Sequence, residues 1–249
     1  YDFSFNLNDE IIIVGHAGMG IASLYPSNSV ESVRRAIALG AGGIELDVQM
    51  TADGEVVVYH DQFLETETNS EGAIWSLPLS DVLEAEYKQP IYARYKVVSL
   101  ENMFFAISES EDLWLSLDMK IRKPDADQQL IEDFADAIYS EIESANLLDK
   151  VIVESRSFDL LKYFQTNYPL VKRVINGLPE NAIQEALTLE AYGVGTELEN
   201  MSLSIREELA ELGLRIILFD VVSKKENREA YRYNAEFIQT DKLGYLLGI

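Results

Sequence analysis

Residues 43–48 read Gly-Ile-Glu-Leu-Asp-Val, an apolar run that two carboxylates, Glu45 and Asp47, interrupt at alternate positions. Successive side chains of a β-strand point to opposite faces, so this run predicts a strand that carries both acids on one face. The commoner role of a charged residue is a surface ion pair, but an unpaired charge inside an apolar run is costly to bury. We therefore expect a buried strand with a chemically active face.

The only two histidines of the chain flank this strand in sequence, and each comes just after an apolar run. His16 follows residues 11–15, and His60 follows residues 56–59 and precedes Asp61. A single histidine beside a strand is more often a packing or surface residue than a catalytic one. Two imidazoles and two carboxylates at the ends of strands indicate a common site at one edge of a sheet.

Short runs rich in β-branched residues alternate with longer stretches of helical period along the rest of the chain. Up to eight such units in 249 residues predict an α/β protein with a TIM (β/α)8 barrel, whose reactive residues lie at the C-terminal strand ends. An open doubly wound sheet is the alternative, which the lack of a Gly-rich dinucleotide turn disfavours. The expected strands are 11–14, 43–48 with a continuation at 55–59, 114–119, 151–154, 171–175, 193–197, 215–219 and 237–239.

The helices, the domain organisation and one insertion follow from the same pattern. We expect a single domain over residues 1–249, because no linker or low-complexity tract divides the chain. Residues 62–99, after the second βα region, are polar, aromatic and irregular, which predicts an insertion. The expected helices begin near Ser29, Leu100, Ala126, Ser157, Pro179, Ser202 and Ser223.

The composition limits the partners and the compartment. With 43 acidic and 20 basic residues, the formal net charge of −23 disfavours nucleic acid and anionic membrane surfaces as partners. No apolar stretch approaches the ~20 residues of a transmembrane helix, and cysteine is absent. We expect a soluble protein, either cytoplasmic or exported, and the start at Tyr1 is compatible with a missing N-terminal segment. The oligomeric state is left open.

A third acid completes a potential metal site. Asp118 and Lys120 lie two residues apart at the end of the expected strand 114–119. Three carboxylates from two strands, together with water, suit one hard divalent cation such as Mg²⁺ or Ca²⁺. A surface salt bridge between Asp118 and Lys120 is the alternative.

Seven short motifs along essentially the whole chain carry a family resemblance. In order and spacing they resemble the glycerophosphodiester phosphodiesterases, and those within the first sixty residues are the most specific. The motifs are Gly15-His16-Ala17-Gly18, Pro26-Ser27-Asn28-Ser29, Gly43-Ile44-Glu45-Leu46-Asp47-Val48, Thr51-Ala52-Asp53-Gly54, Val58-Tyr59-His60-Asp61, Leu117-Asp118-Met119-Lys120 and Thr240-Asp241.

This resemblance implies a TIM-barrel phosphoric diester hydrolase with a small-molecule phosphodiester substrate, which is cleaved to glycerol 3-phosphate and an alcohol. It implies one divalent cation, Mg²⁺ or Ca²⁺, on the metal ligands Glu45, Asp47 and Asp118. It also implies that His16 and His60 are the acid/base pair and that Lys120 contacts the phosphate.

The chain departs from the family pattern at three positions. Ala17 stands where the family usually has an arginine, Ser27 replaces a glutamate, and Asp118 replaces the usual glutamate ligand. Alanine cannot make the forked phosphate contact of an arginine. We expect Arg156, at the end of the expected strand 151–154, to bind substrate and to take over part of that contact. A solvated arginine at the start of a helix is the alternative.

Two other functions stay open. One is a catalytically weakened barrel that binds a phosphorylated ligand, with Ala17 and Ser27 as signs of lost activity. The other is a lipid phosphodiesterase similar to sphingomyelinase D, which Asp118-Met119-Lys120 also resembles and which would require an apolar rim. Aromatic residues of the insertion could form such a rim, although packing against the barrel is their commoner use. These are Trp75, Tyr87, Tyr92 and Tyr95.

Overall fold

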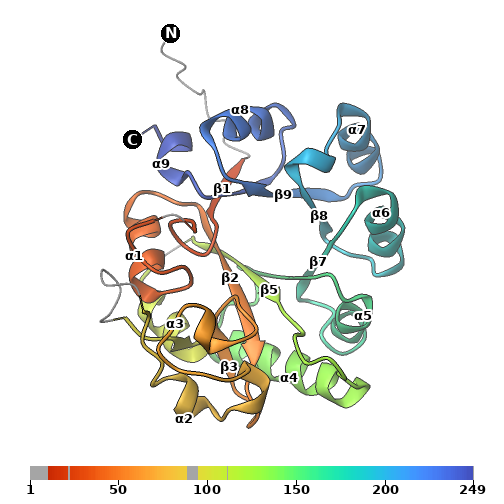
Figure 1. Ribbon diagram of the computed structural model, residues 1–249. Coiled ribbons are helices and arrows are strands. Elements are labelled where there is room, and N and C mark those ends of the chain that lie inside the picture. Colours follow the sequence, from red (N-terminus) through yellow and green to blue (C-terminus); the bar gives the residue numbers. More distant parts are fainter. Residues whose placement is uncertain (1–10, 22, 89–94, 111, 249) are drawn as a thin grey trace.

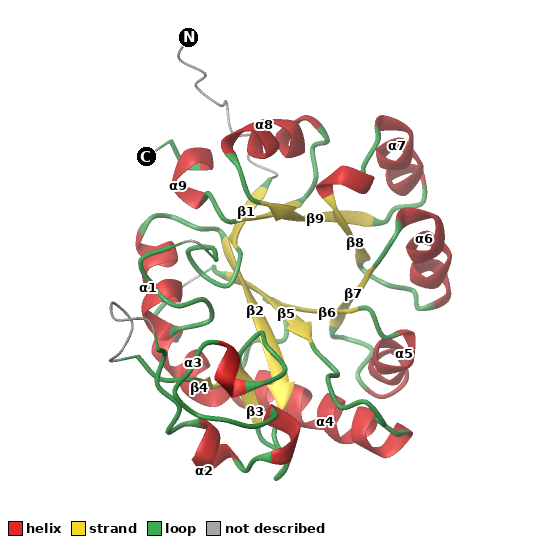
Figure 2. Cartoon of the chain, viewed as in Figure 1, coloured by secondary structure: helices red, strands yellow, loops and turns green. Residues whose placement is uncertain are grey.

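Eight parallel strands form a closed barrel with helices around its outside (Figures 1 and 2). The computed structural model describes residues 11–21, 23–88, 95–110 and 112–248. The strand order is β1-β10-β9-β8-β7-β6-β5-β2, and pairing of β1 with β2 closes the ring. The expected TIM barrel is therefore confirmed. The barrel strands are β1 (Ile12–Gly15), β2 (Gly43–Met50), β5 (Trp114–Met119), β6 (Val151–Ser155), β7 (Lys172–Asn176), β8 (Gly193–Glu197), β9 (Arg215–Val221) and β10 (Phe237–Thr240).

Most of the barrel helices begin near the residues predicted from the sequence, and five of those in the described residues are capped by a serine. The side chains of Ser29, Ser99, Ser157, Ser202 and Ser223 each accept a hydrogen bond from a backbone N–H in the first turn of their helix. Among the helices of the described residues, none has the length and apolar composition needed to span a bilayer. These helices are α1 (Val30–Ala38), α2 (Leu79–Val82), α3 (Leu100–Ile107), α4 (Gln128–Ser144, capped by Asp127), α5 (Phe158–Asn167), α6 (Pro179–Thr188), α7 (Leu203–Glu211), α8 (Lys224–Arg232) and α9 (Leu243–Leu246), with 3₁₀ turns η1 (Leu64–Thr66), η2 (Ile74–Ser76) and η3 (Leu198–Asn200).

Alternation along the strands separates an apolar outer face from a mixed interior. In β2, the side chains of Ile44, Leu46 and Val48 belong to the main core between barrel and helices. Glu45 and Asp47 point to the other face, as expected from the period of two. A second apolar cluster fills one part of the interior with Val14, Ile152, Val174, Ile217 and Phe237. The barrel is thus a packed core, and its polar interior residues lie elsewhere along the strands.

The expected continuation of the second strand is a separate strand that runs in the opposite direction. β2 extends to Met50, the chain turns, and β3 (Val56–Val58) returns antiparallel to it, with Val48 opposite Val58. A short β4 (Val98–Ser99) pairs with β3 outside the barrel. The reversal arises at Thr51-Ala52-Asp53-Gly54, where Gly54 adopts φ +85°. The hairpin brings His60 back to the level of Asp47.

The insertion, which lies between β3 and α3 in sequence, packs on the face of the hairpin that carries Val57 and Tyr59. Its own small core contains Val57 and Tyr59 of the hairpin region together with Leu64 and Ile74. Tyr87 and Tyr95 are also buried in this core, at 3% and 9% exposure, and so use their rings for packing. Tyr92 lies outside the described residues. The insertion therefore supports the segment that carries His60.

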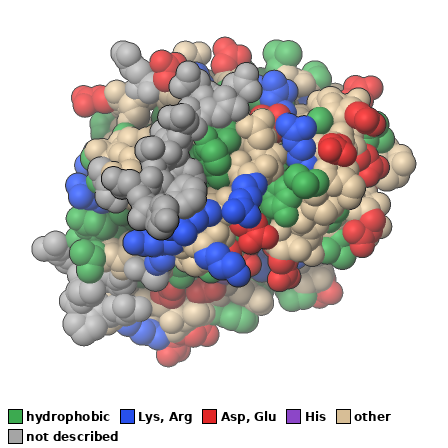
Figure 3. Space-filling view, turned by 90° about the horizontal axis from the view of Figure 1, so that it is seen from above, with side chains coloured by type: hydrophobic (Ala, Val, Ile, Leu, Met, Phe, Trp, Pro, Cys, Tyr) green, Lys and Arg blue, Asp and Glu red, His purple; other side chains and the backbone are tan. Residues whose placement is uncertain are grey.

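On the face drawn in Figure 3, Lys and Arg side chains lie among the acidic ones. The acidic surplus is therefore not separated from the basic residues on that face.

Candidate active site

One cavity at the C-terminal ends of the barrel strands contains every site residue that the sequence predicts. Its volume is about 690 Å³, and its wall also includes residues from β7, β9 and β10. Residues as far apart in sequence as His16 and Gln239 are brought together because parallel strands end at the same edge of a barrel. The predicted residues in its wall are His16, Glu45, Asp47, His60, Asp118, Lys120 and Arg156.

Three carboxylates converge at this edge. Glu45, Asp47 and Asp118 each offer one oxygen, and these oxygens all lie within 4.8 Å of one another. Oxygen ligands at about 2.1 Å from Mg²⁺ or about 2.4 Å from Ca²⁺ lie at most roughly 4–5 Å apart, so the spacing fits a common ion. Burial and the charge of Asp47 raise the pKa of Glu45 well above its ordinary value. A cation would relieve this repulsion, and the acids could therefore hold a metal ion.

The acids are oriented by the loop that follows β1. The backbone N–H of Ala17 donates to Glu45 Oε2 at 2.9 Å. Asn28 grips Asp47 twice: its Nδ2 donates to Asp47 Oδ2 at 2.9 Å, and its Oδ1 accepts from the Asp47 backbone N–H at 3.1 Å. Asn28 belongs to the motif Pro26-Ser27-Asn28-Ser29, but the sequence does not indicate that it binds Asp47. These contacts use Glu45 Oε2 and Asp47 Oδ2, and the other oxygen of Asp47, Oδ1, faces Lys120.

Lys120 lies among the acids. Its Nζ is 3.1 Å from Asp47 Oδ1 and forms a second, short ion pair with Asp118. Burial opposes the charged form of Asp47, but Lys120 and the two imidazoles lower the pKa of this acid below its ordinary value. For Asp118, burial outweighs Lys120 and raises the pKa. Asp47 is therefore the acid that most readily keeps its negative charge.

His16 is held by an acid from the far end of the chain. Its Nδ1 is hydrogen-bonded to Asp241 Oδ1 at 2.7 Å, and its Nε2 lies 3.9 Å from Glu45 Oε2. Burial lowers the pKa of His16, but Asp241 and Glu45 together raise it to about 9. With Nδ1 engaged, Nε2 is the nitrogen that faces the acid cluster. The Thr240-Asp241 motif gave the sequence signal for this partner, although not its role.

His60 is presented by an irregular segment after β3 rather than by a barrel strand. Its Nδ1 lies 3.0 Å from Asp61 Oδ1, and 55% of its side chain is exposed. The buried Gln49 donates from Nε2 to the carbonyls of Tyr59, at 2.6 Å, and Asp61, at 2.8 Å. Arg122 donates to the carbonyl of His60 itself at 3.3 Å. Three consecutive carbonyls are thus fixed by side chains, which sequence reasoning did not foresee.

Arg156 lines the outer part of the cavity. Its Nη2 is 3.1 Å from Glu197 Oε1, and 73% of its side chain is exposed. The ion pair balances part of its charge.

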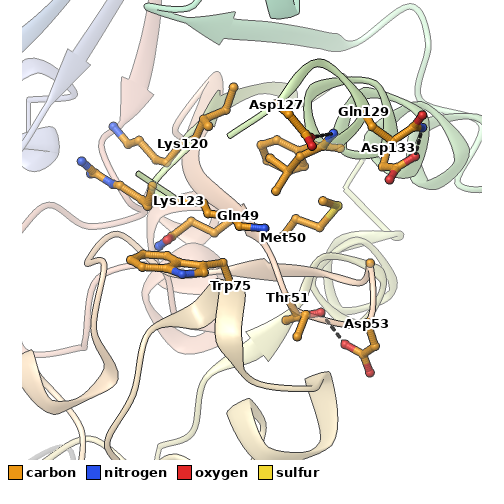
Figure 4. Close-up of a pocket in the computed structure, with 16 residues that line it drawn as sticks. Gln49, Met50, Thr51, Asp53, Trp75, Lys120, Lys123, Asp127, Gln129 and Asp133 are labelled. Atoms are coloured by element: carbon orange, nitrogen blue, oxygen red, sulfur yellow. Dashed lines mark hydrogen bonds between the residues drawn. The ribbon is translucent and has the colours of Figure 1, made fainter. Parts of the chain in front are cut away.

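A second cavity of about 490 Å³ lies beside the first and shares Lys120, Ile121 and Arg122 with it. Figure 4 shows the residues around it: Gln49 from β2, Trp75 from the insertion and Lys123 from the segment after β5. Gln49 Oε1 is buried and has no hydrogen-bond partner among the described residues.

Comparison with known proteins identifies the family. The model of the glycerophosphoryl diester phosphodiesterase family matches residues 19–244. The chain belongs to this family. Members are phosphoric diester hydrolases, and the expected family and enzyme class are therefore confirmed.

Relatives and solved structures agree with this family. The chain is 27% identical over 240 residues to the glycerophosphodiester phosphodiesterase of Caldanaerobacter subterraneus, covering 92% of this chain and 93% of the relative. It is 28% identical over 212 residues to that of Bacillus subtilis, covering 75% and 68%.

Two solved barrels have the same fold. The Oleispira antarctica phosphodiesterase, solved in complex with the product sn-glycerol-3-phosphate, gives a TM-score of 0.85 at 18% identity over 95% of both chains. The Thermotoga maritima glycerophosphodiester phosphodiesterase gives a TM-score of 0.76 at 21% identity over 96% and 97%. At this level of identity the two structures show the fold alone.

Proposed function

We propose that this protein is a metal-dependent glycerophosphodiester phosphodiesterase that releases glycerol 3-phosphate and an alcohol by acid–base catalysis with His16 and His60. The observation that carries the proposal is a single cavity that contains three clustered carboxylates and both histidines of the chain. Both imidazoles are close enough to Asp47 to lower its pKa. A site that only binds a ligand has no need of such a pair.

Glu45, Asp47 and Asp118 would hold one divalent cation, Mg²⁺ or Ca²⁺. When bound, such a cation neutralises charge that develops on the phosphoryl oxygens. Lys120 binds the phosphoryl group from the same side, since its ammonium already lies among the acids. Arg156 is proposed as a further substrate-binding residue at the outer edge of the cavity.

The two imidazoles move the protons. One accepts the proton of the attacking hydroxyl or water, and the other donates a proton to the leaving alcohol oxygen. Asp241 holds His16 so that Nε2 faces the reacting group. Gln49 holds the backbone carbonyls on either side of His60, and Arg122 holds the carbonyl of His60 itself. The rate is expected to fall at both low and high pH, because one imidazole must be neutral while the other is charged.

The test is steady-state hydrolysis of glycerophosphocholine with Mg²⁺, with Ca²⁺ and with EDTA. EDTA is expected to abolish turnover. His16→Ala and His60→Ala are each expected to lower kcat about 10²–10⁴-fold, the usual contribution of a general acid or base. Thermal melts of each variant control for folding.

Metal binding is measured separately. Glu45→Gln is expected to weaken Mg²⁺ or Ca²⁺ binding in a calorimetric titration. Turnover that survives EDTA, or that falls less than about tenfold in both histidine variants, would contradict the proposal. Retained phosphate binding without any turnover would instead favour the weakened, ligand-binding barrel.

A further inference from the structure

The catalytic cavity is poor in free positive charge, although its proposed substrate is an anion. Five carboxylates line it, against three Lys or Arg side chains and the imidazole of His16, which is itself paired with Asp241. Like charges in a partly enclosed cavity repel an incoming phosphate strongly, so the partners of the three cations matter. The carboxylates are Glu45, Asp47, Asp118, Glu197 and Asp220, and the cations are Lys120, Arg122 and Arg156.

Two of the three cations are already balanced by acids. Lys120 is ion-paired with both Asp47 and Asp118. Arg156 is ion-paired with Glu197. Neither offers a full, uncompensated charge to a ligand.

Arg122 differs from both. In the part of the chain that the structure describes, its one hydrogen bond goes to a neutral acceptor, the carbonyl of His60, at 3.3 Å. Its Nε is buried and has no hydrogen-bond partner among those residues. A guanidinium carries five donors in a plane, and among the described residues one acceptor faces those of Arg122. Leaving such donors without an acceptor costs free energy, and an oxyanion would supply acceptors.

The position of Arg122 fits a ligand between the acids and His60. It lies two residues after Lys120 on the segment that follows β5, and both line the same cavity. Its bond to the His60 carbonyl places the guanidinium beside the backbone of the residue whose imidazole is proposed to act on the phosphoryl group. It also lines the second cavity, at the boundary between the two.

We propose that Arg122 binds two phosphoryl oxygens of the substrate in a forked contact, beside the single contact of Lys120. The inference rests on the proposed function for the identity of the substrate, but its chemistry requires only a phosphate group. A planar guanidinium pairs with two oxygens of a phosphate at once, which an ammonium cannot do.

The test measures binding of inorganic phosphate and sn-glycerol 3-phosphate by calorimetry in Mg²⁺, together with kcat and KM for glycerophosphocholine. Arg122→Gln is expected to raise both dissociation constants and KM about 10- to 100-fold, the range for loss of a charge-assisted hydrogen bond. Arg122→Lys keeps the charge without the fork and is expected to lie between this variant and the wild type.

Three comparison variants separate binding from other effects. Lys123→Gln removes a charge from the same segment and is expected to change these constants less than about twofold. Arg156→Gln is expected to have a smaller effect than Arg122→Gln, because Glu197 balances its charge. Gln49→Met removes the support of Tyr59 and Asp61 without removing a charge, and it is expected to lower kcat while phosphate affinity is kept.

The proposal is overturned if Arg122→Gln leaves phosphate affinity within about twofold of the wild type, or if, like Gln49→Met, it lowers kcat alone. It is also overturned if the wild type binds neither anion at millimolar concentration. Arg122-dependent phosphate binding in a protein without turnover would support this inference and contradict the proposed catalytic function.

Discussion

Glu154 is a buried acid inside the barrel that no part of the proposed mechanism uses. It is 1% exposed and accepts hydrogen bonds from Ser116 and Gln239, both at 2.7 Å, and from Asn176 at 3.2 Å. Burial and the charge of Asp118 raise its pKa to about 7. Asn176 and Gln239 line the candidate active-site cavity, so Glu154 orients two residues of its wall.

This raised pKa makes stability depend on pH. The folded protein holds a proton on Glu154 that the unfolded chain releases near pH 4.5, so the wild type loses stability as pH rises from about 4.5 to about 7. Glu154→Gln does not titrate, and Asn176, whose Oδ1 has no partner among the described residues, can turn its amide to accept from the new NH₂. We expect the melting temperature of this variant, relative to that of the wild type, to increase from pH 5 to pH 8. Calorimetry in EDTA measures the difference, and a difference that is constant with pH would contradict the assignment.

The loop between β1 and α1 is packed tightly against the last turn of the barrel. Gly20 adopts φ +90°, and a Cβ there would lie 2.5 Å from the Cα of Asp241. The Gly20 N–H donates to the His16 carbonyl at 2.9 Å, and the Ile21 N–H donates to Asp241 Oδ1 at 3.2 Å. The loop therefore fixes the distance between His16 and the acid that holds it.

Gly20→Ala is expected to disturb both stability and catalysis. A left-handed backbone alone costs a non-glycine residue about 1–2 kcal/mol, and here the new methyl group also displaces Asp241. Gly54→Ala is the matched control, because Gly54 has φ +85° but open space around its Cα. Urea unfolding should show a larger decrease in the free energy of unfolding for Gly20→Ala than for Gly54→Ala, and only Gly20→Ala should lower kcat. Equal losses in the two variants would show that the contact with Asp241 is unimportant.

A net charge of −23 on 249 residues acts on the whole barrel. Mutual repulsion destabilises a compact state, and salt screens it, with a Debye length that falls from about 30 Å at 0.01 M to about 8 Å at 0.15 M. We expect the melting temperature in EDTA to rise with KCl over this range. Tetramethylammonium chloride is the control, because a bulky cation cannot occupy the acid cluster. A melting temperature that falls with both salts would mean that ion pairs such as Lys150–Asp112 outweigh the repulsion.

Local pattern was enough to place most of the strands and to select candidate site residues that the fold brings into one cavity. The β-branched runs, the serine caps and the alternation in residues 43–48 all act within a few neighbours along the chain, which is why they were readable. The sequence predicts residues 55–59 as a continuation of the strand 43–48, whereas β3 runs antiparallel to β2, because a β-branched run does not indicate the direction of its strand.

The partners of those residues depended on closure of the barrel. Asp241 reaches His16 across 225 positions because β10 pairs with β1, and Arg122 reaches His60 across 62 positions because β3 folds back along β2. Such contacts depend on strand register and direction, and neither produces a repeating pattern in the sequence from which it could be predicted. The candidate site residues could therefore be identified from the sequence alone. Their hydrogen-bond partners and pKa shifts depend on which strands pair, and only the tertiary structure determines this pairing.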